Sequence, residues 1–129
     1  MSDLRPVGIP IELGGVERHF LFTLNAIDTV QSHYNSTMFE ALDKLFDANE
    51  QNEALKFFTM TLINDEVERE KWKNPSSDLK EVSEKEVGWM IHVENMGIVT
   101  TAILSAYRIS VPESNENDDP NMESGQQNN

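Results

Sequence analysis

Apolar and polar residues alternate over the first part of the chain. Residues 7–12 read Val-Gly-Ile-Pro-Ile-Glu, which has the two-residue period of a half-buried strand. Gly14 and Gly15 follow, and adjacent glycines can take the positive φ values of a tight turn. We therefore predict a β-hairpin over residues 7–24. The returning strand is expected to place three large apolar side chains on one face: Phe20, Phe22 and Leu24.

Helical spacing replaces this alternation from residue 25 onward. A first helix is expected to begin at Asn25, whose side chain can cap the N-terminus, and to end before Asn35. Thr37 and Glu40 fit a capping box, which predicts the start of a second helix. Four residues form the apolar stripe predicted for that helix: Phe39, Leu42, Leu45 and Phe46.

A third helix is predicted from about Glu53 into the 60s. Positive and negative charges alternate over its continuation, residues 65–73, so this part is expected to be a solvent-exposed extension. The run Asn-Pro-Ser-Ser at residues 74–77 predicts a loop.

The longest helical pattern lies near the end of the chain. Ser83 and Glu86 fit a second capping box, and a single helix is predicted from Glu84 to Arg108. Its second half, residues 96–107, is apolar or small nearly all round. Helices of that kind are usually buried in a core or between subunits, so self-association into a homo-oligomer is left open.

The composition changes after residue 109. The last twenty residues carry acids without bases and little apolar surface, which predicts a disordered acidic tail over residues 110–129. The predicted fold class is α+β, mainly α: a short N-terminal β-hairpin packed on about four helices. The predicted domain organisation is one globular domain, residues 1–109, with the helical bundle over residues 25–109.

Charge and cysteine content restrict the function classes. The net charge is -13, and such a charge repels nucleic acid and anionic membranes. The chain has no cysteine, no signal-peptide pattern and no apolar run long enough to span a membrane. These features agree with a protein of a reducing cytoplasm.

The sequence offers no pattern for catalysis, cofactor binding or metal binding. The three histidines lack an HExxH setting, and Gly14-Gly15 lacks the lysine of a phosphate loop. Glu66 and Glu70 are four residues apart, yet the bases around them favour a solvated charged face over an acid–base pair. We therefore expect no catalytic, cofactor-binding or metal-binding residue.

Aromatic and aliphatic residues instead favour protein binding, since Trp and Met are enriched at interfaces. Trp72 lies in an otherwise charged segment, and Trp89 flanks the apolar face of the last predicted helix. A groove between the second and last helices is the hypothesis for the remaining binding residues, although a place in a closed core is favoured for each one taken individually: Phe39, Leu42, Met90 and Ile98.

Residues 7–27 read VGIPIELGGVERHFLFTLNAI. This stretch resembles the opening of tail assembly chaperones of long-tailed bacteriophages, in which a Leu-Gly-Gly hairpin precedes a helix beginning near Asn-Ala-Ile. The resemblance is specific over residues 7–34 and only architectural up to about residue 109. It implies a non-catalytic assembly chaperone that binds the tape-measure protein, the tail-tube protein or both during tail morphogenesis. It also implies a protein of the host cytoplasm that is absent from the mature virion.

A second interpretation needs no family resemblance. The acidic charge alone suits an interaction module, such as an inhibitor or a DNA mimic, that binds a basic partner. Binding by a DNA mimic should weaken steeply as salt rises, whereas binding to apolar helices should persist.

Overall fold

The computed structural model describes residues 7–110, with side chains described up to Arg108. The elements follow in the order β1 (Ile9–Leu13), β2 (Val16–Phe20), α1 (Leu24–Tyr34), α2 (Met38–Asp43), the 3-10 turn η1 (Lys44–Phe46), α3 (Gln51–Lys73), α4 (Glu84–Met90) and α5 (Met96–Ser110). This architecture confirms the predicted fold class, a short hairpin followed by helices. The predicted acidic tail lies outside the described residues, except for Ser110 at the end of α5.

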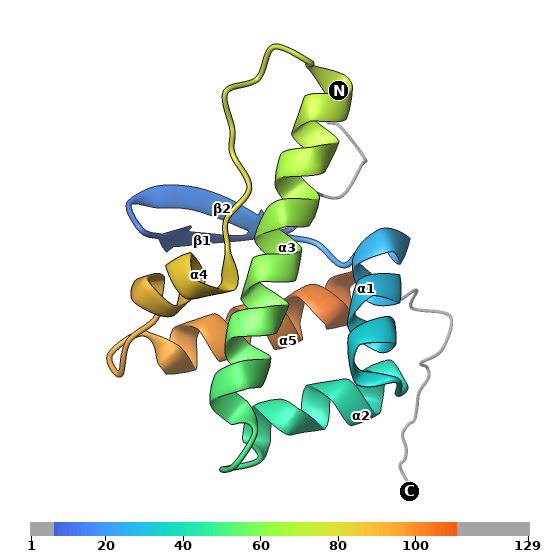
Figure 1. Ribbon diagram of the computed structural model, residues 1–129, viewed down its shortest axis with the longest axis vertical. Coiled ribbons are helices and arrows are strands. Elements are labelled where there is room, and N and C mark those ends of the chain that lie inside the picture. Colours follow the sequence, from blue (N-terminus) through green and yellow to red (C-terminus); the bar gives the residue numbers. More distant parts are fainter. Residues whose placement is uncertain (1–6, 111–129) are drawn as a thin grey trace, which may run out of the picture.

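The helix α3 lies at the centre of the molecule, and the other helices and the hairpin are arranged around it (Figure 1). Residues 54–67 of this helix are all buried or half-buried, because it contacts β2, α1, α4 and α5. Phe58 is fully buried there, with its ring 6.2 Å from that of Phe22 and 6.1 Å from that of Tyr34. One continuous core therefore joins the hairpin to the helices.

The hairpin forms as predicted, with its turn at Gly14 (φ 61°) and Gly15 (φ 80°). The predicted alternation along the returning strand is wrong beyond Phe20. Leu21 and Phe22 are both buried, and Leu24 is 78% exposed on α1. The strand ends at Phe20, so the two-residue period no longer applies to the residues that follow.

The N-cap of α1 is Thr23, and the prediction of Asn25 is wrong by two residues. Thr23 has extended backbone angles, and its Oγ1 accepts a hydrogen bond from the Ala26 N–H at 3.1 Å. The same hydroxyl donates to the Asp65 carboxylate on α3 at 3.0 Å. Thr23 is preferred because its hydroxyl serves the helix terminus and a tertiary contact together.

Both predicted capping boxes are present, at Thr37–Glu40 and at Ser83–Glu86. The predicted apolar stripe of α2 is only half right. Leu42 and Leu45 are buried, and Phe39 and Phe46 are exposed. The buried face follows helical spacing through four residues instead: Met38, Ala41, Leu42 and Leu45.

The charged end of α3 is partly covered, which corrects the prediction of a solvent-exposed extension. Asp65 is buried, and the Glu66 carboxylate accepts the His19 backbone N–H at 2.9 Å and lies 2.8 Å from His19 Nδ1. Val67 is fully buried as well. The hairpin and the start of α1 pack here, so only the last turns of α3 extend into solvent.

The chain between α3 and α4 is fixed to α3 by one side chain. The Asn64 amide donates to the Val82 carbonyl at 2.9 Å and accepts from the Val82 N–H at 2.7 Å. This pair of hydrogen bonds resembles the pairing of two strands. It holds the residue before the α4 cap at a defined place on α3.

The single helix predicted from Glu84 to Arg108 is wrong: α4 ends at Met90 and α5 begins at Met96. Asn95 explains the break, because its side chain competes with the helical backbone. Its Oδ1 accepts the His92 N–H at 2.8 Å, and its Nδ2 donates to the Met90 carbonyl at 3.0 Å. We call the connecting segment, residues 91–95, the elbow.

Candidate protein-binding surface

The elbow creates a cleft between α3, α4 and the start of α5. Its volume is about 330 Å³. We call it the elbow cleft, and it is lined by Asn52, Leu55, Lys56, Gly88, Ile91, His92, Val93 and Met96.

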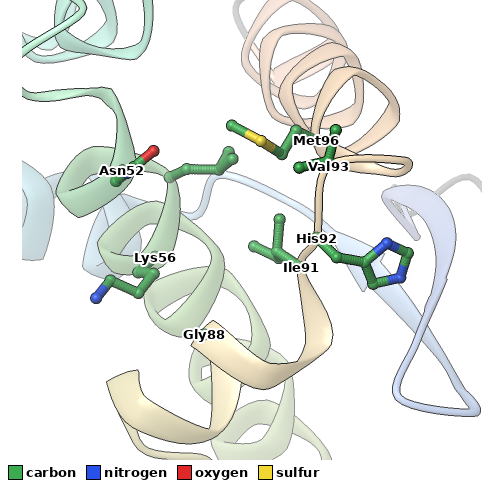
Figure 2. Close-up of a pocket in the computed structure, with 8 residues that line it drawn as sticks. Asn52, Lys56, Gly88, Ile91, His92, Val93 and Met96 are labelled. Carbon is green, nitrogen blue, oxygen red and sulfur yellow. The ribbon is translucent and has the colours of Figure 1, made fainter.

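The interior of the elbow cleft is apolar. Figure 2 shows the side chains of Ile91 and Met96 on its walls, with the Lys56 amine and the His92 ring directed away from them. No carboxylate lines the cleft, although the protein is strongly acidic. Such a surface suits an apolar side chain of a partner better than a charged group.

Gly88 allows α4 to lie close to α3 at the wall of the cleft. A Cβ at this position would come within 3.3 Å of Cδ of Lys56. The lysine stem therefore lies beside the glycine, and its charged end can stay in solvent.

Large apolar side chains are exposed near the cleft. Val93 is 88% exposed on the elbow, and Trp89 is 73% exposed on α4. The Lys85 ammonium lies 6.0 Å from the centre of the Trp89 ring, at the outer range of a cation–π contact. Exposed tryptophan and valine beside an apolar hollow are typical of protein-binding surfaces.

The six residues predicted to bind protein lie in separate places on the structure, and the four assigned to a groove do not come together. Trp89, Met90 and Ile98 lie on α4 and α5, where Met90 is half-buried beside Gly14 and Ile98 is exposed. Phe39 is exposed on α2, with its ring 6.0 Å from that of Tyr107 at the other end of α5.

The other two candidate residues lie away from both of these surfaces. Leu42 is buried in the core, so it is not available to a partner in this conformation. Trp72 is 85% exposed on the last turn of α3. It lies roughly 25 Å along the helix from Leu55, at 1.5 Å per residue.

Sequence reasoning missed the residues that line the elbow cleft, because it treated the elbow as helix. Val93 lies between His92 and Glu94 and was not assigned to any apolar face. The available signal was Asn95, a favoured N-cap residue placed directly before the apolar run of α5.

The carboxylates considered for acid–base chemistry have separate structural partners. Glu66 binds His19, and Glu70 pairs with Lys73 at 3.1 Å. The hydrogen bond to Glu66 raises the pKa of His19 above its ordinary value. Within residues 7–110, no group of three or more His, Asp or Glu side chains is placed to hold a metal ion.

Glu68 and Glu81 form an acidic pair between α3 and the segment before α4. Partial burial, followed by the hydrogen bond with Glu81, raises the pKa of Glu68 above its ordinary value. A carboxyl whose folded pKa is raised favours folding below its unfolded pKa, and this contribution is lost as the pH rises through the folded pKa. Ionised Glu68 therefore weakens the fold at neutral pH.

We expect Glu68→Gln to raise the midpoint of urea unfolding at pH 7, and the gain should vanish near pH 4. Urea titrations at the two pH values check this result. Glu81→Gln should behave in the same way, since it removes the other member of the pair. A Glu68→Gln variant that is less stable than the parent at pH 7 would contradict the assignment.

Among the described residues, no helix is long and apolar enough to cross a membrane. Comparison of the chain with protein-family models, curated proteins and solved structures finds no match.

Proposed function

We propose that the protein is a non-catalytic assembly chaperone that binds the tape-measure protein, the tail-tube protein or both, while a phage tail is built in the host cytoplasm. The elbow cleft carries the proposal, because it is an apolar hollow beside exposed Trp89 and Val93 on a protein of net charge -13. The resemblance of residues 7–34 to tail assembly chaperones supports the choice of partner.

The elbow cleft suits a long helical partner. An amphipathic helix that has not yet assembled exposes an apolar face, and a cleft can receive one or two of its side chains. Binding there would cover that face. The high like charge of the complexes would keep them apart in solution, which opposes aggregation.

Co-expression with the tape-measure protein encoded in the same genome tests the proposal. We expect the two proteins to co-purify, and we expect Val93→Asp to weaken binding at least about tenfold, because an ionised group would enter an apolar contact. Titration calorimetry with a tape-measure segment that co-purifies measures the change.

Leu24→Asp is the matched control, since Leu24 is 78% exposed on α1, outside the residues that line the cleft. It should bind like the parent. Equal binding by Val93→Asp and the parent would refute a role for the cleft. Binding that persists from about 50 to about 500 mM salt supports apolar contact, whereas a steep loss would favour the acidic interaction module.

A further inference from the structure

Within residues 7–110, the outward side of α5 is a helix face that no other element covers. Val99, Ala102, Ile103 and Ala106 fill the core from the opposite side of the helix. The exposed side begins at a shallow hollow lined by Glu94, Gly97, Ile98 and Thr101, where Ile98 is 64% exposed. It continues at helical spacing through Ser105 to Arg108. We call this surface the α5 face.

Charge is absent from the middle of the α5 face and present at its two ends. Residues 95–107 contain no Asp, Glu, Lys or Arg, the longest such run in the chain. Glu94 lies before this run and Arg108 after it. In the described part of the chain, neither side chain forms an ion pair. An acid at one end and a base at the other make the face complementary to itself.

We propose that the α5 face binds the α5 face of a second copy of this protein, with the two helices antiparallel. Thr101 is seven residues from both Glu94 and Arg108. A two-fold axis at Thr101 therefore places Glu94 of each copy opposite Arg108 of the other. In the same register the open space at Gly97 lies opposite Ser105, and exposed Ile98 lies opposite Leu104, which is half-buried against the core of its own copy.

The self-pairing is weak by the standards of stable dimers. A single pair of fifteen-residue helices covers less than the roughly 1,200 Å² of a standard interface. The expected dimer therefore forms only at high protein concentration. It leaves the elbow cleft free, because Met96 and Val93 lie outside the α5 face, so it is independent of the proposed chaperone function.

Sedimentation velocity and light scattering of the full chain test the pairing. We expect the parent protein to approach twice the mass of one chain as its concentration rises. Glu94→Lys and Arg108→Glu each create two like-charge pairs across the axis, so each variant should dissociate at least about tenfold more readily. Glu94→Gln should lie between these variants and the parent, because it removes attraction without adding repulsion.

The decisive experiment measures the mass of an equimolar mixture of the Glu94→Lys and Arg108→Glu variants. In an equimolar mixture, Lys at position 94 meets Glu at position 108, and the remaining Arg108 meets the remaining Glu94, so a heterodimer should form where neither variant dimerises alone. Circular dichroism of each variant checks that α5 stays folded. A parent that stays monomeric at millimolar concentration, or a mixture that stays monomeric, would overturn the proposal.

Discussion

Phe58→Ala is expected to lower the free energy of unfolding by about 3–5 kcal/mol, the range measured for Phe→Ala in well-packed cores. Phe58 is fully buried on α3, and its ring packs edge-on against Phe22 and nearly parallel to Tyr34. Removing the ring leaves a cavity between the hairpin, α1 and α3. Domains of this size have a free energy of unfolding of only about 5–15 kcal/mol, so the variant would lose much of its stability.

Thermal unfolding followed by circular dichroism measures this effect. A loss of that size should lower the Tm by more than about 10 °C in a domain of roughly 100 residues. Phe39→Ala is the matched control, because Phe39 is 72% exposed and its loss should change the Tm little. Similar Tm values for the Phe58 and Phe39 variants would mean that the core is not centred on α3.

Glu66→Ala is expected to cost about 1.5–3 kcal/mol, the range for hydrogen bonds to charged groups. The Glu66 carboxylate accepts the His19 backbone N–H at 2.9 Å and lies 2.8 Å from His19 Nδ1. Both contacts join β2 to α3. Without the carboxylate, the outer edge of β2 loses its acceptor, and the hairpin should detach more readily from the helices.

The pH dependence of stability separates the charge contribution from the packing contribution. The pKa of His19 is raised, so the His19–Glu66 ion pair stabilises the fold fully below the unfolded histidine pKa of about 6.5 and is lost as the pH rises through the folded value. The difference in stability between the parent and Glu66→Ala should therefore shrink between pH 6 and pH 9.

Urea unfolding over this pH range, with Glu70→Ala as the control, checks the expectation. Glu70 pairs with Lys73 on the surface of α3, and surface pairs of this kind contribute less than about 1 kcal/mol. A pH-independent loss in Glu66→Ala would show that Glu66 does not raise the pKa of His19.

The elements with strong local signals were predictable from the sequence. The Gly14-Gly15 turn and the capping boxes at Thr37 and Ser83 depend on residues close in sequence, so their patterns are sufficient to identify them. The fold class followed from the same signals. In contrast, the start of α1 depends on Asp65, which is 42 residues from Thr23 along the chain. Local propensity favoured Asn25 because it does not include such a contact.

The candidate binding surface was less predictable than the fold. Trp89 and Ile98 were named as binding candidates, with a core position as the alternative, and both are exposed; the elbow cleft itself was missed. The cleft exists only because Asn95 ends the helical run. Apolar residues precede and follow Asn95, so the hydrophobic pattern does not indicate the break. Leu42 and Phe39 both fit an apolar stripe in the sequence, yet Leu42 lies on the buried face with Met38 and Ala41, and Phe39 is exposed.

The Asn64–Val82 hydrogen bonds bear on which segment of the sequence can change in length during evolution. They fix where the chain rejoins α3, so the position of α4 does not depend on the path taken by residues 74–78, which precede the core contact of Leu79. Insertions or deletions in that stretch should therefore accumulate among relatives without displacing the cap at Ser83. We expect the length of this segment to differ between relatives and Asn64 to be retained in them.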